Sequence, residues 1–291
     1  MEIHILNLIQ GMSTIVKHDN GSVSMIDVCT GNKSVPKGYN QPLNYLLRMD
    51  IKSLARFILT CPIKENIDGI NAVYQEIGFR NFWNSGVLVD KWENASSEDD
   101  IDYNLYRDLM LERHNDCCHS LRVETGYASP YANFEVLSPS QSLMSAEGLD
   151  VIDASIVLLI KSVHGHKILF SGDVGRRAYL EMAANSTVRS KLEDIDVLIV
   201  RRDVALMESL DIVSHVIRPK SIIYGGANSN TISFPMPFDA AQINVRDFGT
   251  VIIDDTSGRL SIYAEHPNRC SRYDGDGAKH PAYDVINIIN L

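Results

Sequence analysis

The sequence lacks the features that mark exported and membrane-spanning proteins. It has no basic segment followed by an apolar one at its start, and no apolar run approaches the roughly 20 residues that cross a bilayer. Its five cysteines are an odd number without a framework spacing, which is typical of a reducing compartment. We therefore expect a soluble, cytoplasmic protein without a membrane partner.

Two common catalytic or binding motifs are also missing, and positive charge is in deficit. No Gly-x-Ser-x-Gly elbow occurs, which excludes the usual α/β-hydrolase nucleophile motif. Residues 31–34, GNKS, lack the upstream glycine of a phosphate-cradling loop. Lys and Arg number 27 against 37 Asp and Glu, and the net charge of −10 repels nucleic-acid phosphate. General nucleic-acid binding is therefore disfavoured.

The apolar patterns that are present alternate between strand and helix. At 291 residues the chain can form one large α/β domain or two small ones. Asn20-Gly21 predicts a type I′ hairpin turn, and Gly78 predicts a helix C-cap. The first half predicts strands over 2–8, 13–17, 23–28, 54–60 and 79–83, and helices over 43–49 and 65–77. This alternation favours an α/β sandwich.

The second half begins with an acidic, helical segment at about 90–120, which we interpret as an inserted helix and not a second domain. His114, Cys117, Cys118 and His119 concentrate possible ligands there, with 114 and 118 on one helix face. Because a structural zinc site usually pairs two such clusters, two semi-buried thiols are the favoured interpretation. Strands are expected over 134–139, 154–162, 167–171, 196–200, 221–225, 245–254, 259–264 and 285–291, and a helix over 176–184.

Three short segments carry a resemblance to a known family. The opening residues 1–13 read MEIHILNLIQGMS, residues 59–69 read LTCPIKENIDG, and residues 167–174 read KILFSGDV. They resemble the metallo-β-lactamase fold, specifically the soluble hydrolases related to the ComEC-type DNA-uptake domain. The second segment corresponds to the family motif Leu-Thr-His-x-His-x-Asp-His-x-x-Gly. The resemblance implies an αββα sandwich over residues 1–265, with residues 266–291 as a C-terminal extension.

The residues that hold metals in this family are mostly replaced here. The four metal-site positions of the second segment hold Cys61, Ile63, Glu65 and Asn66. Asp173 matches the aspartate that bridges the two metals, and Asp27 matches a supporting aspartate. Where the family has two further histidines, this chain has Arg202 and Asp203 after one strand and Phe234 in a late loop. Isoleucine and phenylalanine cannot ligate, and an arginine cannot be deprotonated to do so.

These replacements predict a fold that has lost its metal. A guanidinium from Arg202 is expected to neutralise Asp173 in its place. The alternative is a rewired zinc or manganese site built from Cys61, Glu65, Asp173 and Asp203, since thiolates and carboxylates are metal ligands. The arginines at 176, 177, 201 and 202 predict a small patch that binds phosphate or carboxylate, with salt bridges to the surplus acids as the other interpretation.

The functional hypothesis is a catalytically inactive protein that binds a partner as a structural or regulatory subunit. The resemblance implies an ATPase or nuclease subunit in a bacterial defence or DNA-processing system as that partner. The alternative hypothesis is a metal-dependent phosphodiesterase or nuclease with substituted ligands. A third is a sensor whose arginines hold a phosphorylated small molecule without turnover.

Overall fold

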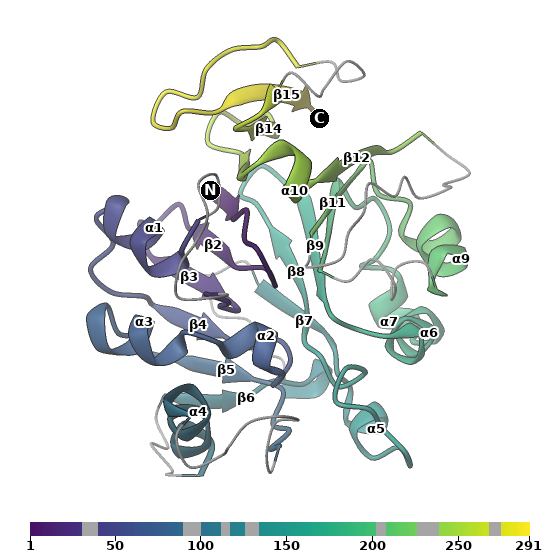
Figure 1. Cartoon of the computed structure of the whole chain (residues 1–291). Coiled ribbons are helices and arrows are strands. Elements are labelled where there is room, and N and C mark those ends of the chain that lie inside the picture. Colours follow the sequence, from purple (N-terminus) through teal and green to yellow (C-terminus); the bar gives the residue numbers. More distant parts are fainter. Residues whose placement is uncertain are drawn as a thin grey trace.

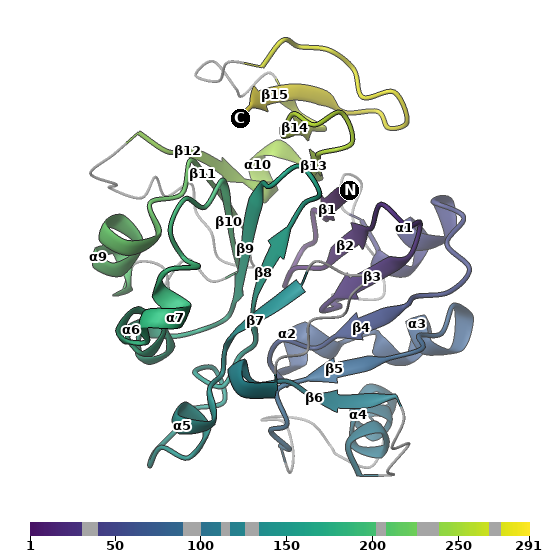
Figure 2. The ribbon, with the colours of Figure 1, turned by 180° about the vertical axis from the view of Figure 1, so that it is seen from behind.

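The computed structural model describes residues 1–30, 40–89, 100–111, 117–125, 134–201, 208–225, 239–267 and 275–291. Within them the strands form two sheets, and helices cover the outer face of each (Figures 1 and 2). The nine-stranded sheet has the order β15-β14-β13-β1-β2-β3-β4-β5-β6, and the six-stranded sheet has the order β12-β11-β10-β9-β8-β7. The predicted αββα sandwich is confirmed.

The bounds of the elements follow the apolar patterns with local differences. The strands are β1 (Glu2–Ile5), β2 (Thr14–Lys17), β3 (Val23–Ile26), β4 (Arg56–Ile58), β5 (Phe82–Asn84), β6 (Cys118–Ser120), β7 (Phe134–Ser138), β8 (Val157–Lys161), β9 (Lys167–Gly172), β10 (Val197–Val200), β11 (Ser221–Tyr224), β12 (Ala241–Asn244), β13 (Val251–Asp254), β14 (Ser261–Ala264) and β15 (Ile286–Asn290). The α-helices are α1 (Pro42–Arg48), α2 (Lys64–Ile67), α3 (Ile70–Glu76), α4 (Ile101–Leu111), α5 (Gln141–Met144), α6 (Arg176–Ala184), α7 (Ser186–Arg189), α9 (Leu210–Ile212) and α10 (Val245–Phe248). A 3₁₀ turn covers Val123–Thr125, and a π-helical turn covers Val213–Ile217.

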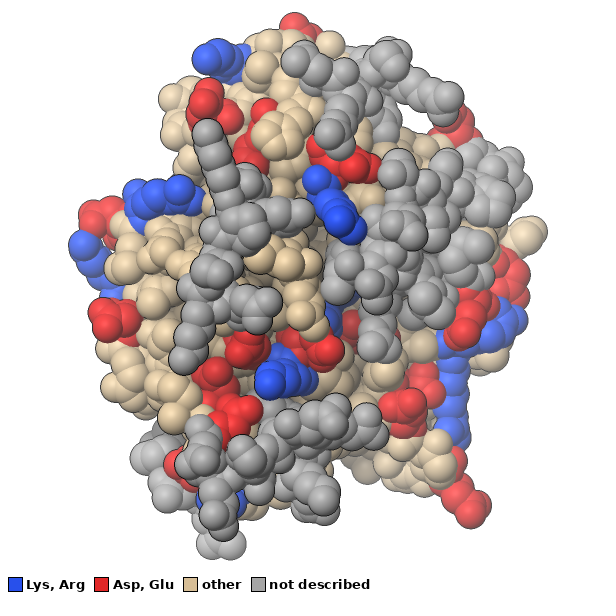
Figure 3. All heavy atoms as spheres, in the orientation of Figure 1, with Lys and Arg blue, Asp and Glu red and all other residues tan. Residues whose placement is uncertain are grey.

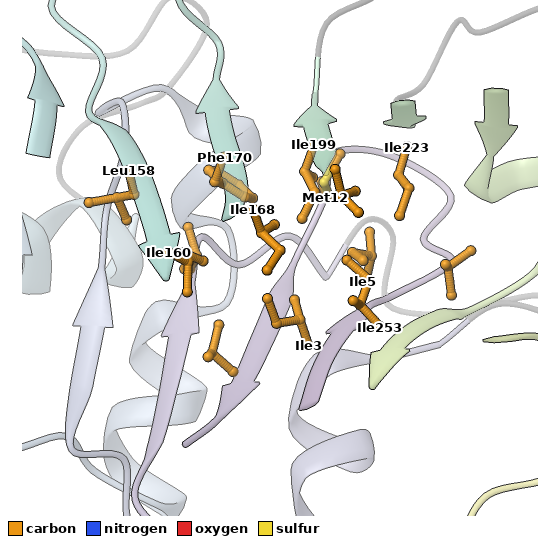
Figure 4. Packing of buried hydrophobic residues seen from close by; sticks show 14 of the residues in the cluster. Ile3, Ile5, Met12, Leu158, Ile160, Ile168, Phe170, Ile199, Ile223 and Ile253 are labelled. Carbon is orange, nitrogen blue, oxygen red and sulfur yellow. The ribbon is translucent and has the colours of Figure 1, made fainter. Parts of the chain in front are cut away.

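The alternation of side chains along the strands produces three apolar layers. In β1, Ile3 and Ile5 face the layer between the two sheets, where they meet Ile168 and Phe170 of β9 (Figure 4). Leu169 of β9 faces the opposite way and packs with the layer beneath α6 and α7. Helices α1 to α4 cover the third layer, on the outer face of β2 to β5. Burying one such side chain stabilises the fold by about 1.5–3 kcal/mol.

Four predictions of local structure are wrong in detail. Gly21 has a positive φ of 78° but Asn20 does not, so the β2–β3 turn is not type I′. The predicted helix over 65–77 is two helices, because Asp68 and Gly69 leave the helical conformation between α2 and α3. The predicted strand over 245–254 begins as α10, whose N-terminus the Asn244 side chain caps. Cys118 lies in the strand β6 and not on the helix expected for it.

Two segments are integrated into the nine-stranded sheet. Helix α4 connects the parallel strands β5 and β6, and its Asp102 accepts hydrogen bonds from the amides of Gly69 and Asn71. Strand β15 pairs with β14 at the end of the sheet, as predicted for 285–291. Tyr283, just before β15, donates to Glu2 of β1 at 2.9 Å. These contacts fasten the residues after 275 to the opening strand.

Candidate functional site

The sequence-predicted site residues that the structure brings together lie where strands of both sheets end. Asp27 follows β3, Cys61 follows β4 by three residues, and Asp173 and Arg201 follow β9 and β10 directly. Asn66 comes from α2, the short helix after β4. All five side chains are buried, and they follow strands of both sheets. Parallel strands whose carboxyl ends meet in this way commonly carry the functional residues of α/β proteins.

An ion pair forms the centre of this cluster. The Nη1 atom of Arg201 donates to Oδ2 of Asp173 at 2.5 Å and also to Oδ1 of Asn66. The Asn66 amide donates to the same Asp173 oxygen at 2.8 Å. Burial alone would lower the pKa of Arg201, but the negative charges of Asp173 and Asp27 outweigh it and raise that pKa. Arg201 is therefore a fixed positive charge inside the sandwich.

A break in the helix after β4 places Asn66 in this cluster. The backbone carbonyls of Asn66 and Asp68 accept hydrogen bonds from the amides of Val28 and Thr30, at 2.8 and 2.9 Å. Because these carbonyls accept hydrogen bonds from outside the helix, α2 ends after one turn. Gly69 permits the break, since its φ is 105° and a Cβ there would meet Cγ2 of Thr30 at 2.3 Å.

Asp27 holds the second carboxylate of the cluster. It accepts from the amide of Thr60 at 2.8 Å and from the Thr60 hydroxyl at 2.6 Å. Its own backbone is left-handed, with a φ of 54°, a conformation that non-glycine residues adopt mainly at constrained sites. Burial raises the pKa of Asp27 to about 7, against the opposing effect of the Thr60 hydrogen bonds and the Arg201 charge. Asp27 thus changes charge near neutral pH.

Cys61 is a fully buried thiol beside these charges. Its Sγ donates to the carbonyl of Val151 at 3.4 Å. Burial is the main cause that raises its pKa, and the charge of Asp173 raises it further. The thiolate, which is the metal ligand and the nucleophile, is therefore disfavoured.

The other predicted site residues do not join the cluster or lie outside the description. Ile63 precedes α2, and Glu65 is partly exposed on it. Arg202, Asp203 and Phe234 lie outside the described residues, as does His114. The guanidinium that reaches Asp173 is that of Arg201, the neighbour of the residue expected from the sequence.

The arginines expected to form one anion-binding patch have separate partners in the described part of the chain. Arg176 makes a two-fold ion pair with Asp211, at 2.6 and 2.8 Å. Arg177 donates to the backbone carbonyls of Glu147 and Gly148. Arg201 is buried against Asp173. On the face drawn in Figure 3, basic side chains of the described residues are scattered among acidic ones.

A metal pair of the kind that the sequence resemblance implies does not fit the described residues of this cluster. Among the residues with described positions, no group of three or more His, Cys, Asp or Glu side chains is arranged to hold a metal ion. Oδ2 of Asp173 already accepts hydrogen bonds from the Asn66 amide and from the cationic guanidinium of Arg201. A divalent cation placed at Asp173 would be repelled by the positive charge of the adjacent Arg201 guanidinium.

Comparison with solved structures matches the two-sheet architecture. The CmlA β-hydroxylase E377D mutant aligns with a TM-score of 0.50 at 10% identity, over 87% of this chain and 53% of that one. This protein has the metallo-β-lactamase fold. A metallo hydrolase from the archaeon Ignicoccus hospitalis aligns with a TM-score of 0.49 at 12% identity, over 87% of this chain and 99% of that one. A diphosphatase of the PhnP family aligns with a TM-score of 0.47 at 12% identity, over 87% and 97%.

The metallo-β-lactamase fold is therefore shown by architecture and not by sequence similarity. No protein-family model and no curated protein matches the chain. In the described residues no helix is long and apolar enough to cross a membrane. What the site does must be argued from its own residues, because identities near 10% carry no information on chemistry.

Proposed function

We propose that this protein is a catalytically inactive member of the metallo-β-lactamase fold that serves as a structural or regulatory, partner-binding subunit. The single observation that carries the proposal is the Arg201 guanidinium, buried in contact with both Asp173 and Asn66. In this interpretation the arginine supplies the positive charge that metal ions supply in hydrolases of the same fold.

The proposal is supported by the chemistry of the donors. A metal-dependent hydrolase needs several neutral imidazoles or ionised carboxylates around an open position, where a bound water is acidified. Here Asn66 donates its amide hydrogen to Asp173, and the thiol of Cys61 donates to a backbone carbonyl. Within the described residues, the Asn66 amide and the Arg201 guanidinium therefore already occupy Oδ2 of Asp173.

The partner is proposed to be a protein. The sequence resemblance implies an ATPase or nuclease subunit of a bacterial defence or DNA-processing system. The net charge of −10 disfavours direct binding of nucleic acid, so DNA or RNA would be contacted by the partner. A subunit without its own chemistry would contribute shape and stability to such an assembly.

The test is the metal content of protein purified without a nickel step, measured by plasma mass spectrometry. The matched variants are Asp173→Ala, in the cluster, and Asp211→Ala, at an exposed ion pair. We expect near-zero zinc, manganese and iron in all three proteins, and no hydrolysis of a phosphodiester substrate after zinc or manganese is added.

One result would instead favour the metal-dependent hydrolase. About one or two metals per chain in the wild type, lost in Asp173→Ala and kept in Asp211→Ala, would overturn the proposal. The ligand set to test would then be Cys61, Glu65, Asp173 and Asp203 with zinc or manganese.

A further inference from the structure

The edge of the nine-stranded sheet that carries Asp27 and Cys61 continues past them to β6. Strands β3, β4, β5 and β6 run parallel, so the residues that follow them lie along one edge (Figure 1). Asp27 and Cys61 come after β3 and β4, whereas Ser85 comes after β5 and Arg122 after β6. Open α/β sheets bind ligands outside the carboxyl ends of their strands. The far end of this edge therefore carries a basic side chain in a position where ligands bind.

Two backbone carbonyls hold the guanidinium of Arg122 in place. Its Nη1 atom donates to the carbonyl of Ser85 at 2.5 Å and to that of Leu121 at 2.6 Å. The Thr125 hydroxyl closes the turn behind it, because it accepts from the Arg122 amide at 3.0 Å and donates to the Arg122 carbonyl at 2.7 Å. Carbonyls are neutral acceptors, so these bonds fix the position of the guanidinium and do not neutralise its charge.

One side of this guanidinium has no acceptor in the described part of the chain. The two hydrogens of Nη1 are used by the carbonyls, and the recorded side-chain bonds of Arg122 include none from Nε or Nη2. These two nitrogens share one side of the planar group, where their parallel N–H bonds match two oxygens of a carboxylate or phosphate. Arg122 is partly exposed, so such a group can reach it.

Gly86 leaves room beside Nη2. Its φ is 68°, and a Cβ at this position would lie 2.8 Å from Nη2 of Arg122 and 3.0 Å from the hydroxyl oxygen of Ser120. A side chain at residue 86 would therefore crowd the guanidinium. The preceding residue, Ser85, has a buried hydroxyl without a hydrogen-bond partner among the described residues. The polar groups around Arg122 are thus not completed by this part of the chain itself.

Glu124 is the acidic side chain that acts on Arg122. Its Oε2 atom accepts from the amide of Gln141, at the start of α5, at 2.9 Å. Burial lowers the pKa of Arg122, and the charge of Glu124 opposes this shift only in part. An arginine nevertheless stays protonated in proteins. Arg122 is therefore a fixed, partly buried cation that is held by neutral groups.

We propose that Arg122, with Gly86 and Ser120 beside it, forms a binding site for an oxyanion, the phosphate or carboxylate group of a small ligand. The oxyanion accepts from Nε and Nη2 as a side-on pair, while Nη1 stays on the two carbonyls. The site shares an edge of the sheet with Asp27 but uses no residue of the Arg201 cluster. It therefore goes beyond the proposed function and does not depend on whether that cluster holds a metal.

The test is a titration of chelator-treated protein with inorganic phosphate and, separately, with acetate at constant ionic strength. NMR follows the Arg122 Nε–H signal in the wild type and the Gly86 amide signal in all proteins. Arg122→Lys keeps the charge but loses the two parallel N–H bonds, and the matched control is Arg176→Lys, at the exposed pair with Asp211. We expect saturable binding in the wild type and in Arg176→Lys, and binding weaker by about tenfold or more in Arg122→Lys. The anion that binds more tightly identifies a phosphorylated or a carboxylic ligand.

Two results would overturn the proposal. Equal affinity of Arg122→Lys and the wild type would show that a positive charge suffices at this position and that no side-on pair is made. Failure of both anions to shift the Arg122 Nε–H signal in a saturable way would also overturn it. This second measurement uses the wild type alone, so it remains decisive if Arg122→Lys does not fold. Metal content has its own readout, so either this proposal or the proposed function can fail without the other.

Discussion

Replacement of Arg201 by methionine is the perturbation that tests the centre of the cluster most directly. The change removes the guanidinium and keeps an unbranched apolar side chain, so Asp173 loses its cation. The Arg201 and Asp173 side chains are 5% and 0% exposed, so solvent does not screen the pair. Removal of one partner of a buried pair costs about 3–5 kcal/mol. That is a large part of the ~5–15 kcal/mol that stabilises a typical domain.

The double variant Arg201→Met/Asp173→Leu separates the loss of the pair from the loss of one charge. Apolar replacement of both partners of a buried pair is often neutral or stabilising by about 1–4 kcal/mol. The Asn66 amide would lose its acceptor, which costs about 1–3 kcal/mol. These two effects nearly cancel, so we expect the double variant to lie close to the wild type and to be more stable than Arg201→Met.

The assay is urea unfolding followed by tryptophan fluorescence and circular dichroism, with coincident transitions and unchanged m-values required. Arg176→Met is the control, because it removes an arginine from an exposed pair with Asp211, and we expect little change in stability. A loss below about 1 kcal/mol in Arg201→Met would refute the inference that this guanidinium balances Asp173. A double variant no more stable than Arg201→Met would refute it equally.

Two further predictions concern the buried neighbours of this pair. Burial raises the folded-state pKa of Asp27 to about 7, so its contribution to stability is complete below pH about 4 and is lost as the pH rises to about 7. The variant Asp27→Asn stays neutral and should flatten the pH profile of urea unfolding over this window, by on the order of 4 kcal/mol. An unchanged profile would contradict the assignment. Because Cys61 is fully buried and burial raises its pKa, we expect iodoacetamide to leave it unmodified in native protein and to modify it in urea, as measured by peptide mass mapping, with partly exposed Cys117 as the internal control.

The sequence predicts most of the fold because the apolar alternation is strong where strands are buried. Ile3 and Ile5 in β1, and Ile168 and Phe170 in β9, have the period of two that the structure confirms. The break at Gly69 was missed, since the helical period continues on both sides of it. The deciding contacts, from Val28 and Thr30, come from about 40 residues earlier in the chain.

The sequence predicts most positions of the site, but it assigns the ion pair with Asp173 to Arg202. The arginine that contacts Asp173 is the adjacent Arg201. Ile199 faces the layer between the sheets, and Arg201, two residues later, points to the same side. This period of two along the strand could have identified Arg201, from the sequence alone, as the arginine that contacts Asp173. Asp173 is harder to place, because the register between β9 and β10 shifts after the pair of Phe170 and Ile199. Ser171 is the extra residue, and a bulge of this kind reverses the facing of the residues that follow it.

The place of β1 within its sheet has a consequence for synthesis of the chain. Glu2 pairs with Lys17 on one side and with Asp254 on the other. The first partner leaves the ribosome almost at once, whereas the second follows some 250 residues later. At about 5–20 residues per second, one edge of β1 lacks its native partner for roughly 12–50 s. An unpaired apolar edge is prone to pair with other chains. A nascent chain of this protein therefore exposes one edge of β1 until β13 has been made.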